Sequence, residues 1–382
     1  MSELYELPDG WEWRKLNDEK VCNLIMGQSP KSDTYNSNNE GMPFFQGKTE
    51  FGDTYPTVRK YCTAPKKIAE IGDILLSVRA PVGPTNIANI QCCIGRGLGA
   101  IRPNINNTLT NYLLYFFRNF ELEISQKGKG STFSAITKKE LENTNIPLPP
   151  LKEQKRIVAK LDTLFKKIDK AIELHQQNID DIDGFMASVL NEVFLELEGR
   201  YEKKQLKEIV DNYDGKRIPI KSSDRESISG KYPYYGASGI IDYVNDYIFD
   251  GEYLLISEDG ANLTVRKYPI AFIADGKFWV NNHAHIVSAK NNISTNKYME
   301  YIFAYTNISG YITGSAQPKM SQGKMNLIEF VIPPLNIQQK TVKYLDEVSQ
   351  NIEKLKALQI EKKESLKALK SSLLDRAFRG EL

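Results

Sequence analysis

The sequence has few of the residues from which catalytic and metal sites are usually built. Its 382 residues include three histidines and four cysteines, and the cysteines form no CxxC pair. This spacing excludes the common zinc motifs and a disulfide framework, and it is typical of a protein from a reducing compartment. The formal net charge of +2 neither supports nor excludes binding to nucleic acid.

Motifs for phosphate binding and hydrolysis are missing as well. The chain has no GxxxxGK[ST], HExxH or GxSxG sequence, and GRGLG at 95–99 is a poor match to a dinucleotide-binding fingerprint. The segment NHAH at 282–285, with Asp259, could be drawn as a metal cluster. However, histidines two residues apart lie on the same face of a strand whether or not metal is bound. We therefore predict a non-catalytic protein without a metal site.

The sequence also has little that would direct it to a membrane. No run approaches the ~18 apolar residues that are needed to span a bilayer. The first residues, MSELYELPDGWEWRKLND, lack the basic segment and apolar core of a signal peptide. We therefore expect a cytoplasmic location.

The strongest feature that is present is an internal repeat. When the sequence is shifted by 184 positions, identical residues coincide over two stretches that begin near 149 and 333. In the first copy these positions are Pro149, Pro150, Leu151, Gln154, Val158, Leu161, Asp162, Ile168, Lys170, Ser188, Leu190 and Phe194. One fixed register over this length indicates a duplication, so the chain consists of two related halves.

Each copy has the pattern of one long helix. A double proline marks the start, because proline fits the first turn of a helix but not its interior. Downstream, apolar residues recur every three or four positions, with lysine, aspartate and glutamate between them. Roughly 40 residues at about 1.5 Å each give a helix of the order of 60 Å.

A helix of this length with one apolar stripe needs a partner. Each copy could pack on its own globular half, but two equal halves favour an approximate two-fold axis, and so an antiparallel coiled coil. His175 and Gln359 occupy equivalent stripe positions near the midpoints, and we predict that they lie near each other. The predicted seam residues are Leu161, Leu164, Ile168, His175, Ile182, Leu345, Val348, Ile352, Gln359 and Leu366.

The segment before the first long helix is predicted to be mostly β. Residues 1–148 contain short β-branched and aromatic runs, such as DILLSV at 73–78, separated by glycine and proline turns. Residues 111–123 change to a helical pattern, and Thr137 followed by Glu140 marks another helix start.

The segment between the two long helices repeats this plan. KYMEYIFAY at 297–305 corresponds to the aromatic helix at 111–123, and GSAQPKM at 314–320 follows the same 184-residue register as the long helices. The fold class is therefore α+β, with two mostly-β domains and two long helices. The predicted boundaries are 1–148 for the first domain, 149–197 for the first helical region, 198–332 for the second domain and 333–382 for the second helical region.

The duplication also predicts which parts of the chain lie together at its ends. After the first helix the chain runs into LKEIV at 206–210, whereas the matching WRKLND at 13–18 has no helix before it. If the halves are equivalent, the C-terminal helix must supply this neighbour. We therefore expect Leu382 to lie close to the N-terminal segment.

Loops of both halves carry residues that suit binding to nucleic acid. Arg and Lys suit guanine edges and phosphates, Asn and Gln suit adenine, and Gly lets a backbone approach the duplex. The candidates are Gln28, Lys31, Gln46, Lys48, Arg79, Arg96, Lys127, Lys129 and Ser131 in the first half, and Lys216, Arg217, Tyr235, Ser238, Asn262, Arg266, Asn281, His283, Gln317 and Lys319 in the second. Polar residues are common in any surface loop, so this signal gains weight only from the architecture. Two different domains on a rigid helical pair could read two half-sites.

A set of sequence motifs spans both halves. They are LPDGWEW (7–13), GDILLSVRAPVG (72–83), IGRGLGAIRP (94–103), GSTFSAITKKELENTNIPLPPLKEQ (130–154), EDGANL (258–263), WVNNHAH (279–285), GSAQPKM (314–320), IPPLNIQQ (332–339) and AFRGEL (377–382). In combination they resemble the specificity subunits of type I restriction-modification systems. The resemblance implies two target-recognition domains that alternate with two helical regions. Each domain would read one half of a bipartite DNA site, and the helices would set the gap.

The resemblance also implies partners. Subunits of this kind bind two methyltransferase subunits, which use S-adenosylmethionine to methylate adenine, and the larger assembly adds ATP-dependent translocase-nuclease subunits. The chain itself is then expected to hold no cofactor. Residues 152–160 and 336–344 are the expected docking surfaces, although the second copy lacks the charged start, PLPPLKEQ, of the first.

Two other functions are weighed against this one. A helical scaffold that binds only proteins would show no affinity for DNA, with or without partners. An enzyme with its own nuclease or methylase site would need a motif that the sequence does not contain.

Overall fold

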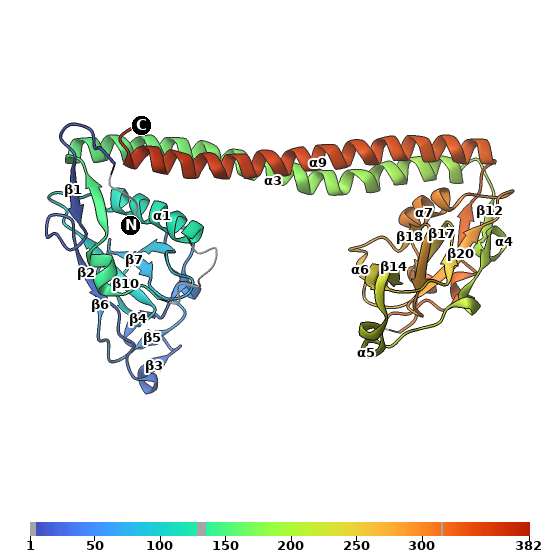
Figure 1. Ribbon diagram of the computed structural model, residues 1–382, viewed down its shortest axis with the longest axis horizontal. Helices are drawn as coiled ribbons and strands as arrows, with labels where there is room; N and C mark the ends of the chain where they lie inside the picture. The colour runs from blue at the N-terminus through green and yellow to red at the C-terminus, as the bar shows by residue number, and fades with distance from the viewer. Residues whose placement is uncertain (1–4, 128–134, 315) are drawn as a thin grey trace. The chain divides into compact units, whose positions relative to one another are not determined.

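The computed structural model describes residues 5–127, 135–314 and 316–382. The chain forms two compact units: unit 1 is Met1–His175 with Glu361–Leu382, and unit 2 is Gln176–Ile360. The fold is α+β, as predicted, because each unit combines a sheet-rich domain with parts of two long helices, α3 (Leu151–Glu198) and α9 (Leu335–Phe378) (Figure 1). Both helices begin directly after the double prolines.

The domain of unit 1 contains two larger sheets and one strand pair. The antiparallel four-stranded sheet has the order β2 (Cys22–Met26), β10 (Leu98–Pro103), β7 (Ile74–Ser77) and β8 (Thr85–Ile87). The five-stranded sheet has the order β3 (Tyr35–Asn36), β5 (Tyr61–Cys62), β4 (Met42–Phe45), β9 (Cys92–Ile94) and β6 (Ile68–Ala69), and β4 runs parallel to β9. The strand pair, β1 (Glu12–Lys15) with β11 (Asn145–Leu148), leads into α3.

The domain of unit 2 has a similar topology, with one strand fewer in its second sheet. Its antiparallel sheet has the order β13 (Val210–Asn212), β20 (Ala284–Ala289), β17 (Tyr253–Ser257) and β18 (Ala271–Ala274). Its other sheet has the order β15 (Gly239–Val244), β14 (Ser229–Gly236), β19 (Lys277–Val280) and β16 (Phe249–Asp250), again with one parallel pair, β14 and β19. The strand pair that leads into α9 is β12 (Lys203–Gln205) with β21 (Glu329–Val331).

Short helices complete each domain. They are α1 (Thr110–Lys127) and α2 (Lys138–Glu142) in unit 1, and α4 (Leu206–Ile209), α5 (Ser222–Arg225), α6 (Asn262–Val265), α7 (Asn296–Tyr305) and α8 (Gln322–Met325) in unit 2. The predicted capping box starts α2, with Thr137 Oγ1 accepting from Glu140 N. In Figure 1, α1 lies between the four-stranded sheet and the long helices of unit 1, and α7 has the same place in unit 2.

The core of each unit joins its domain to both long helices. In unit 1, Phe117 from α1 and Leu161 from α3 share one buried cluster with Phe378 from α9. In unit 2, the corresponding cluster contains Phe194 from α3 and Leu345 from α9. Each long helix therefore packs its apolar stripe against both a sheet-rich domain and the other long helix. The sequence left open whether the helices pack on their domains or on each other, and both kinds of packing occur.

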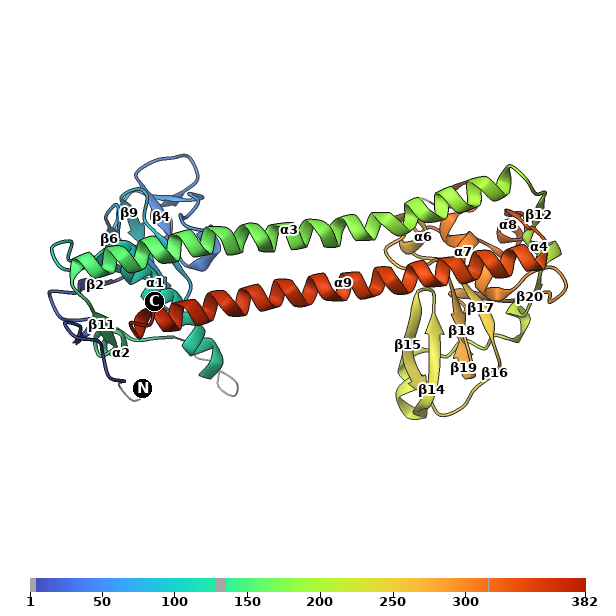
Figure 2. The ribbon, with the colours of Figure 1, turned by 90° about the horizontal axis from the view of Figure 1, so that it is seen from above.

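The two long helices run in opposite directions within unit 1. Arg156 Nη2 donates to Leu382 O at 2.6 Å, and Lys370 Nζ lies 2.7 Å from the carboxylate of Asp169, so α9 runs back as α3 runs forward. Figure 2 shows the two helices side by side over this unit. Tyr5 Oη also donates to Phe378 O at 2.8 Å, which confirms that the C-terminal helix lies against the N-terminal segment.

The predicted seam residues lie in both units. Leu161 and Ile168 in unit 1 and Leu345 in unit 2 are buried, whereas Leu164, His175, Ile182, Val348, Ile352, Gln359 and Leu366 are half-buried. Within unit 2, Asn178 Nδ2 donates to Gln359 Oε1 at 3.4 Å. His175 and Gln359 belong to different units, and their proximity stays a prediction.

Two buried glutamines at equivalent repeat positions fix the start of each long helix to its domain. Gln154 donates to a carbonyl of the loop 107–109 and to the carbonyl of the proline before α3, both at 2.8 Å, and accepts from a backbone N–H of the same loop. Gln338 likewise donates to Ile293 O and to Pro333 O, but it accepts from the side-chain hydroxyl of Ser294 in place of a backbone N–H. Both side chains are fully buried with every polar atom bonded.

A tyrosine–aspartate pair follows about two turns further along each helix. Tyr115 from α1 donates to Asp162 on α3, and Tyr301 from α7 donates to Asp346 on α9 at 2.6 Å. Burial, and then the hydrogen bond to a carboxylate, raises the pKa of both tyrosines, so each phenol remains a donor. The two long helices are thus attached to their domains by the same chemistry.

This attachment predicts a clear difference between two neighbouring glutamines. Gln338→Ala leaves backbone groups without partners in the core of unit 2, so we expect the free energy of unfolding to fall by about 2–4 kcal/mol. Gln339→Ala, at the exposed neighbouring position, should change it by less than about 0.5 kcal/mol. The measurement is urea unfolding followed by the fluorescence of Trp279, after Trp11 and Trp13 have been replaced by phenylalanine. Equal effects of the two substitutions would contradict the proposed anchor.

Candidate nucleic-acid interface

Three loops at the strand ends of unit 1 form one cluster. These loops are residues 27–31, 46–48 and 95–97, and they are called the unit 1 loop cluster below. The backbone N–H of Gln28 donates to Ile94 O at 3.0 Å, directly before the 95–97 loop. The backbone N–H of Gly95 donates to Phe45 O at 2.8 Å, which joins the 95–97 loop to the start of the 46–48 loop. The strands β2, β4, β9 and β10 therefore place these loops next to one another.

Glycine allows this close approach of backbones. A Cβ atom on Gly27 would lie 2.1 Å from Gly95 O, and one on Gly97 would lie 2.4 Å from Gln46 O. Any side chain at these positions would push the loops apart, because the facing atoms are backbone and cannot rotate away. The GRGLG segment is therefore a packing element of the loop cluster.

Gln46, a predicted DNA contact, also holds the cluster together. Its Nε2 donates to Ser29 Oγ at 3.0 Å, and the backbone N–H of Arg96 donates to the same oxygen at 3.2 Å. The hydroxyl thus joins all three loops. The Arg96 side chain remains exposed on the outside of this framework.

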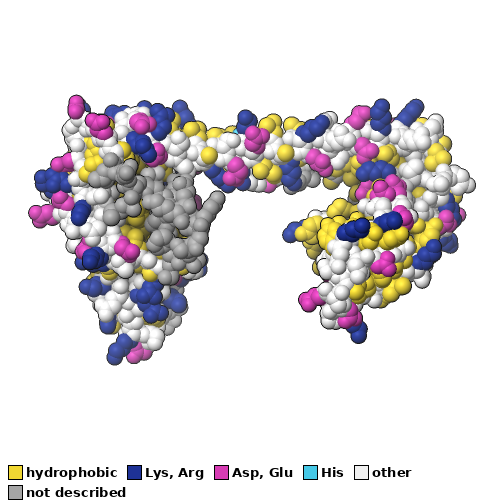
Figure 3. All heavy atoms as spheres, in the orientation of Figure 1, with side chains coloured by type: hydrophobic (Ala, Val, Ile, Leu, Met, Phe, Trp, Pro, Cys, Tyr) yellow, Lys and Arg dark blue, Asp and Glu magenta, His cyan; other side chains and the backbone are white. Residues whose placement is uncertain are grey.

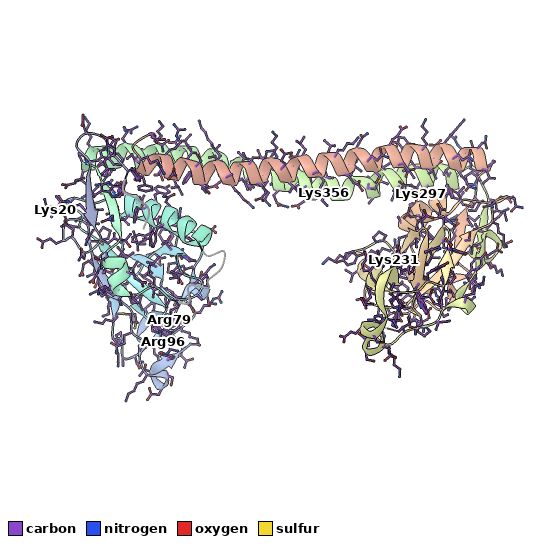
Figure 4. All side chains as sticks on the ribbon, in the orientation of Figure 1. Lys20, Arg79, Arg96, Lys231, Lys297 and Lys356 are labelled. Carbon is purple, nitrogen blue, oxygen red and sulfur yellow. The ribbon has the colours of Figure 1, made fainter. Side chains whose placement is uncertain are left out.

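The loop cluster carries exposed cationic side chains, and another is that of Arg79, whose preceding residue Val78 donates its N–H to Gly97 O. Lys48 interacts electrostatically with the Glu121 carboxylate. Lys31, Lys48, Arg79 and Arg96 are exposed, and none of them forms a salt bridge within the described part of the chain. Arg79 and Lys48 line a cleft of about 320 Å³ with backbone from residues 47 and 97. Figure 4 shows Arg79 and Arg96 in the same part of unit 1, and Figure 3 shows Lys and Arg side chains around β3, β4 and β5. This surface can bind anionic or acceptor-rich groups.

The matching region of unit 2 pairs its charges internally. Arg217 Nη1 lies 2.8 Å from Glu258 and also donates to Ala284 O at 2.7 Å, while its Nη2 lies 3.4 Å from Asp214. The Arg217 side chain is 14% exposed. Lys319 Nζ lies 3.2 Å from the other oxygen of Glu258. The predicted contact residue Arg217 is therefore engaged inside its own unit.

His285 belongs to the same buried network. Its Nδ1 lies 2.6 Å from Asp214, and its Nε2 lies 2.8 Å from Met320 O. A carboxylate and a carbonyl are both acceptors, so both ring nitrogens must carry protons for both hydrogen bonds to form. Burial acts to raise the pKa of Asp214, but the hydrogen bond and charge of His285, with Ile286 N and Arg217, lower it overall.

Asn281 and His283 lie at the open end of this region. His283 Nδ1 lies 2.8 Å from the Asp259 carboxylate, and about half of the imidazole is exposed. The backbone N–H of His283 donates to Asn281 Oδ1 at 2.8 Å. The ring is therefore held at one nitrogen and presents the other to solvent.

The remaining candidates divide between internal bonds and open surface. Arg266 donates to Thr306 O at 2.6 Å, and Asn262 bonds both backbone groups of Tyr268. Lys216 lies over the ring of Tyr213, Tyr235 packs against Phe272 and Phe278, and Gln28, Ser238 and Gln317 are exposed. Lys129, Ser131 and the side chain of Lys127 lie outside the described residues. All of these positions stay predictions as DNA contacts.

One protein-family model matches the chain twice, once in each half of the duplication. Residues 8–182 and 198–362 each match the type I restriction modification DNA specificity domain. The chain belongs to this family. Each match contains one sheet-rich domain and part of a long helix, so the specificity-domain family accounts for both units. Members of this family are specificity subunits, which are non-catalytic.

Individual relatives and solved structures agree with the family. The chain is 44% identical over 190 residues to the MjaX type I restriction enzyme specificity subunit of Methanocaldococcus jannaschii, over 50% of this chain and 44% of that one. The matches to several curated relatives span less than half of their length. A chain from a study of assembly and conformational transition in a type I R-M system has the same fold, with TM-score 0.79 and 21% identity over 99% of this chain and all of the other. The HsdS subunit of Thermoanaerobacter tengcongensis gives 0.62 and 22%, over 99% of each chain.

An apolar feature of the unit 2 surface was not predicted from the sequence. Ile240 and Ile241 follow the turn between β14 and β15, and both are about half exposed. The segment GASG at 236–239 is a short glycine-flanked turn between strand-like runs, which is a hairpin signal. That signal could have shown that the two isoleucines lie at a hairpin tip, but only polar residues were selected.

Within residues 5–127, 135–314 and 316–382, no three His, Cys, Asp or Glu side chains come together in a way that could hold a metal ion. His283 and His285, the histidines of the alternative metal cluster, bond to different aspartates. None of the described helices is both long and apolar enough to cross a bilayer.

The buried network predicts a pH dependence of unit 2. The folded-state pKa of Asp214 is below that of the unfolded chain, about 3.9, so its charge stabilises the fold above this value. This contribution is lost as the pH falls through the folded pKa. We expect Asp214→Asn to lower the free energy of unfolding by about 2–4 kcal/mol at pH 7 and to flatten its decline between about pH 5 and pH 3.

Asp211→Asn is the matched control for this experiment, since Asp211 is exposed at the neighbouring strand β13. Trp279 fluorescence again reports the unfolding of unit 2. If Asp214→Asn and wild type lost stability in parallel as the pH fell, Asp214 would not be the group that titrates.

Proposed function

We propose that the chain is the DNA-reading subunit of a type I restriction-modification complex. In this proposal it binds an asymmetric, bipartite site in double-stranded DNA, and each sheet-rich domain reads one half. Family membership supports recognition of DNA, and the duplication supports two reading domains. The domain boundaries proposed from the sequence are 1–148, 149–197, 198–332 and 333–382.

The observation that carries the proposal is the unit 1 loop cluster. Its backbone is fixed by glycine contacts and hydrogen bonds, so little conformational freedom remains to be given up on binding. Arg79 and Arg96 are exposed without carboxylate partners in the described chain, and their guanidinium groups suit guanine O6 and N7 or phosphate oxygens. A rigid backbone with free cationic side chains suits recognition of DNA.

The contrast between the two units supports an asymmetric site. In unit 1, Arg79 and Arg96 form no salt bridge within the described residues, whereas unit 2 ties Arg217 to Glu258 and Asp214 and ties His283 to Asp259. Donors and acceptors therefore differ on two domains of similar topology. Two surfaces of different chemistry would select two different sequences.

The long helices supply the rest of the proposal. Each of α3 and α9 contributes residues to both units, so we assign the gap between half-sites to the helical pair. Partners in this proposal are two methyltransferase subunits, docked on residues 152–160 and 336–344, and the restriction subunits. S-adenosylmethionine and ATP would be bound by those partners, in the cytoplasm. Exposed charged side chains such as Lys152 and Lys155 in the first segment, and the half-exposed Tyr344 in the second, support docking there.

The loop cluster gives a direct test with charge-removing substitutions. Arg79→Ala and Arg96→Ala together should weaken DNA binding at least tenfold, because each guanidinium contact contributes about 1–3 kcal/mol. Lys20→Ala is the control, since Lys20 lies on a different side of unit 1 (Figure 4). The measurement is a salt titration of binding by the chain purified with its methyltransferase partner. For each arginine that binds a phosphate, its removal should lower the slope of log K against log salt by about 0.9.

Exchange of one domain tests the bipartite reading. We expect selection from a randomised duplex pool to recover a split, asymmetric motif. Replacement of residues 1–148 by the equivalent segment of a relative should then change one half of the motif and leave the other half and the gap intact. Formation of the complex without recovery of any motif would instead support the protein scaffold.

A further inference from the structure

The hairpin formed by β14 and β15 ends in a tight turn at the surface of unit 2. Gly236 pairs with Gly239, which leaves two residues for the turn, and Gly239 has φ +131°, a value that favours glycine. Ser257 Oγ donates to Ala237 O at 2.5 Å, so the turn is bonded to the end of the neighbouring β17. The hairpin tip is therefore held in place beside the Asn281 and His283 loop.

A β-bulge directs two consecutive isoleucines outward. Tyr235 pairs with Ile240 and Tyr234 pairs with Asp242, so Ile241 is an extra residue in β15. In a regular strand neighbouring side chains point to opposite faces, and a bulge changes this direction locally. Ile240 and Ile241 are 46% and 52% exposed. The hairpin thus presents apolar side chains where a regular strand would bury one of them.

Gly236 brings Ile241 next to Asn281. A Cβ atom on Gly236 would lie 3.0 Å from Ile241 Cγ2 and 3.6 Å from Asn281 Nδ2. Both groups therefore lie against the same backbone position, and the absence of a side chain leaves room for them. An apolar methyl group and an amide nitrogen form neighbouring parts of one surface.

The amide of Asn281 is buried, oriented and incompletely bonded. The side chain is 6% exposed, and its Oδ1 accepts from His283 N, so the amide nitrogen must face the other way. Within the described residues, Asn281 Nδ2 has no hydrogen-bond partner, and the atom keeps some contact with solvent. A donor held in this way is available to an acceptor from outside the unit.

We infer that Ile241 and Asn281 together read one thymine of the half-site bound by unit 2, an inference that rests on the proposed function. Thymine presents O4, an acceptor, beside its C5-methyl group in the major groove, whereas cytosine presents a donor and no methyl group. The amide donor of Asn281 beside the apolar side chain of Ile241 matches the acceptor and methyl group of thymine. It does not match the donor of cytosine. The half-exposed apolar residues of β15 are Ile240, Ile241 and Tyr243. Three such side chains are too few for a stable protein interface, which buries about 800 Å² per partner.

The first test removes only the methyl group. Each thymine in the unit 2 half-site of the selected motif is replaced in turn by deoxyuridine, and binding by the chain with its methyltransferase partner is measured. At one position we expect binding to weaken about three- to fivefold, as for one buried methyl group. Ile241→Ala should abolish this preference for thymine over deoxyuridine. Leu327→Ala, a leucine of the same unit that is 45% exposed, should retain it.

The second test changes the donor to an acceptor. Asn281→Asp keeps an oxygen for His283 N but replaces the free amide by a carboxylate, which accepts from cytosine N4. We expect the preferred base at the same position to change from thymine to cytosine in a renewed selection. Retention of the thymine would exclude Asn281 as the reader.

The outcomes separate the inference from the proposed function. A split motif whose unit 2 half has no thymine, or in which no thymine responds to deoxyuridine, overturns the inference and leaves the function in place. Binding without any sequence preference overturns both. Equal sensitivity of wild type and Ile241→Ala to deoxyuridine assigns the methyl contact to another residue and also overturns it.

Discussion

The attachment of each long helix to its domain is the interaction on which the rest of the structure depends. At both helix starts a buried glutamine bonds backbone groups of the domain, and a tyrosine bonds an aspartate further along the helix. Such polar groups are costly to bury unless every one is bonded, so the joint tolerates few alternative arrangements. Because the bonds run to residues next to α1 and α7 and to the helix itself, the loops at the far strand ends can vary without weakening the joint.

In the loops at the strand ends, different groups fix the backbone and form the exposed surface. In unit 1 the glycine contacts and Ser29 fix the backbone, while Arg79 and Arg96 project from it. In unit 2 the same strand order carries a network of Asp214, Arg217 and His285 instead. Similar topologies therefore support two surfaces of opposite character, since the strand pairing does not depend on the side chains at the loop tips.

Much of the architecture could be predicted because the sequence contains an internal repeat. Identical residues 184 positions apart located both helices, the two domains and the contact between the C-terminal helix and the N-terminal segment. The common strand order was not predictable, because strands such as β3 and β5 have two residues and show no periodicity. Arg217 and Arg266 were chosen as DNA contacts from residue type, yet the structure surrounds them with internal acceptors. A sequence does not show which acceptors face a side chain.

Unit 1 is discontinuous in the chain, since its core contains Leu373, Leu374, Ala377 and Phe378 together with residues from the first 175 positions. During synthesis on the ribosome, the first domain therefore emerges long before the helix that covers part of its core. Unit 2, whose segments are contiguous from 176 to 360, can complete its core first. The order of folding would then reverse the order of synthesis, and the exposed apolar surface of the waiting domain would be most vulnerable to aggregation or chaperone capture in that interval.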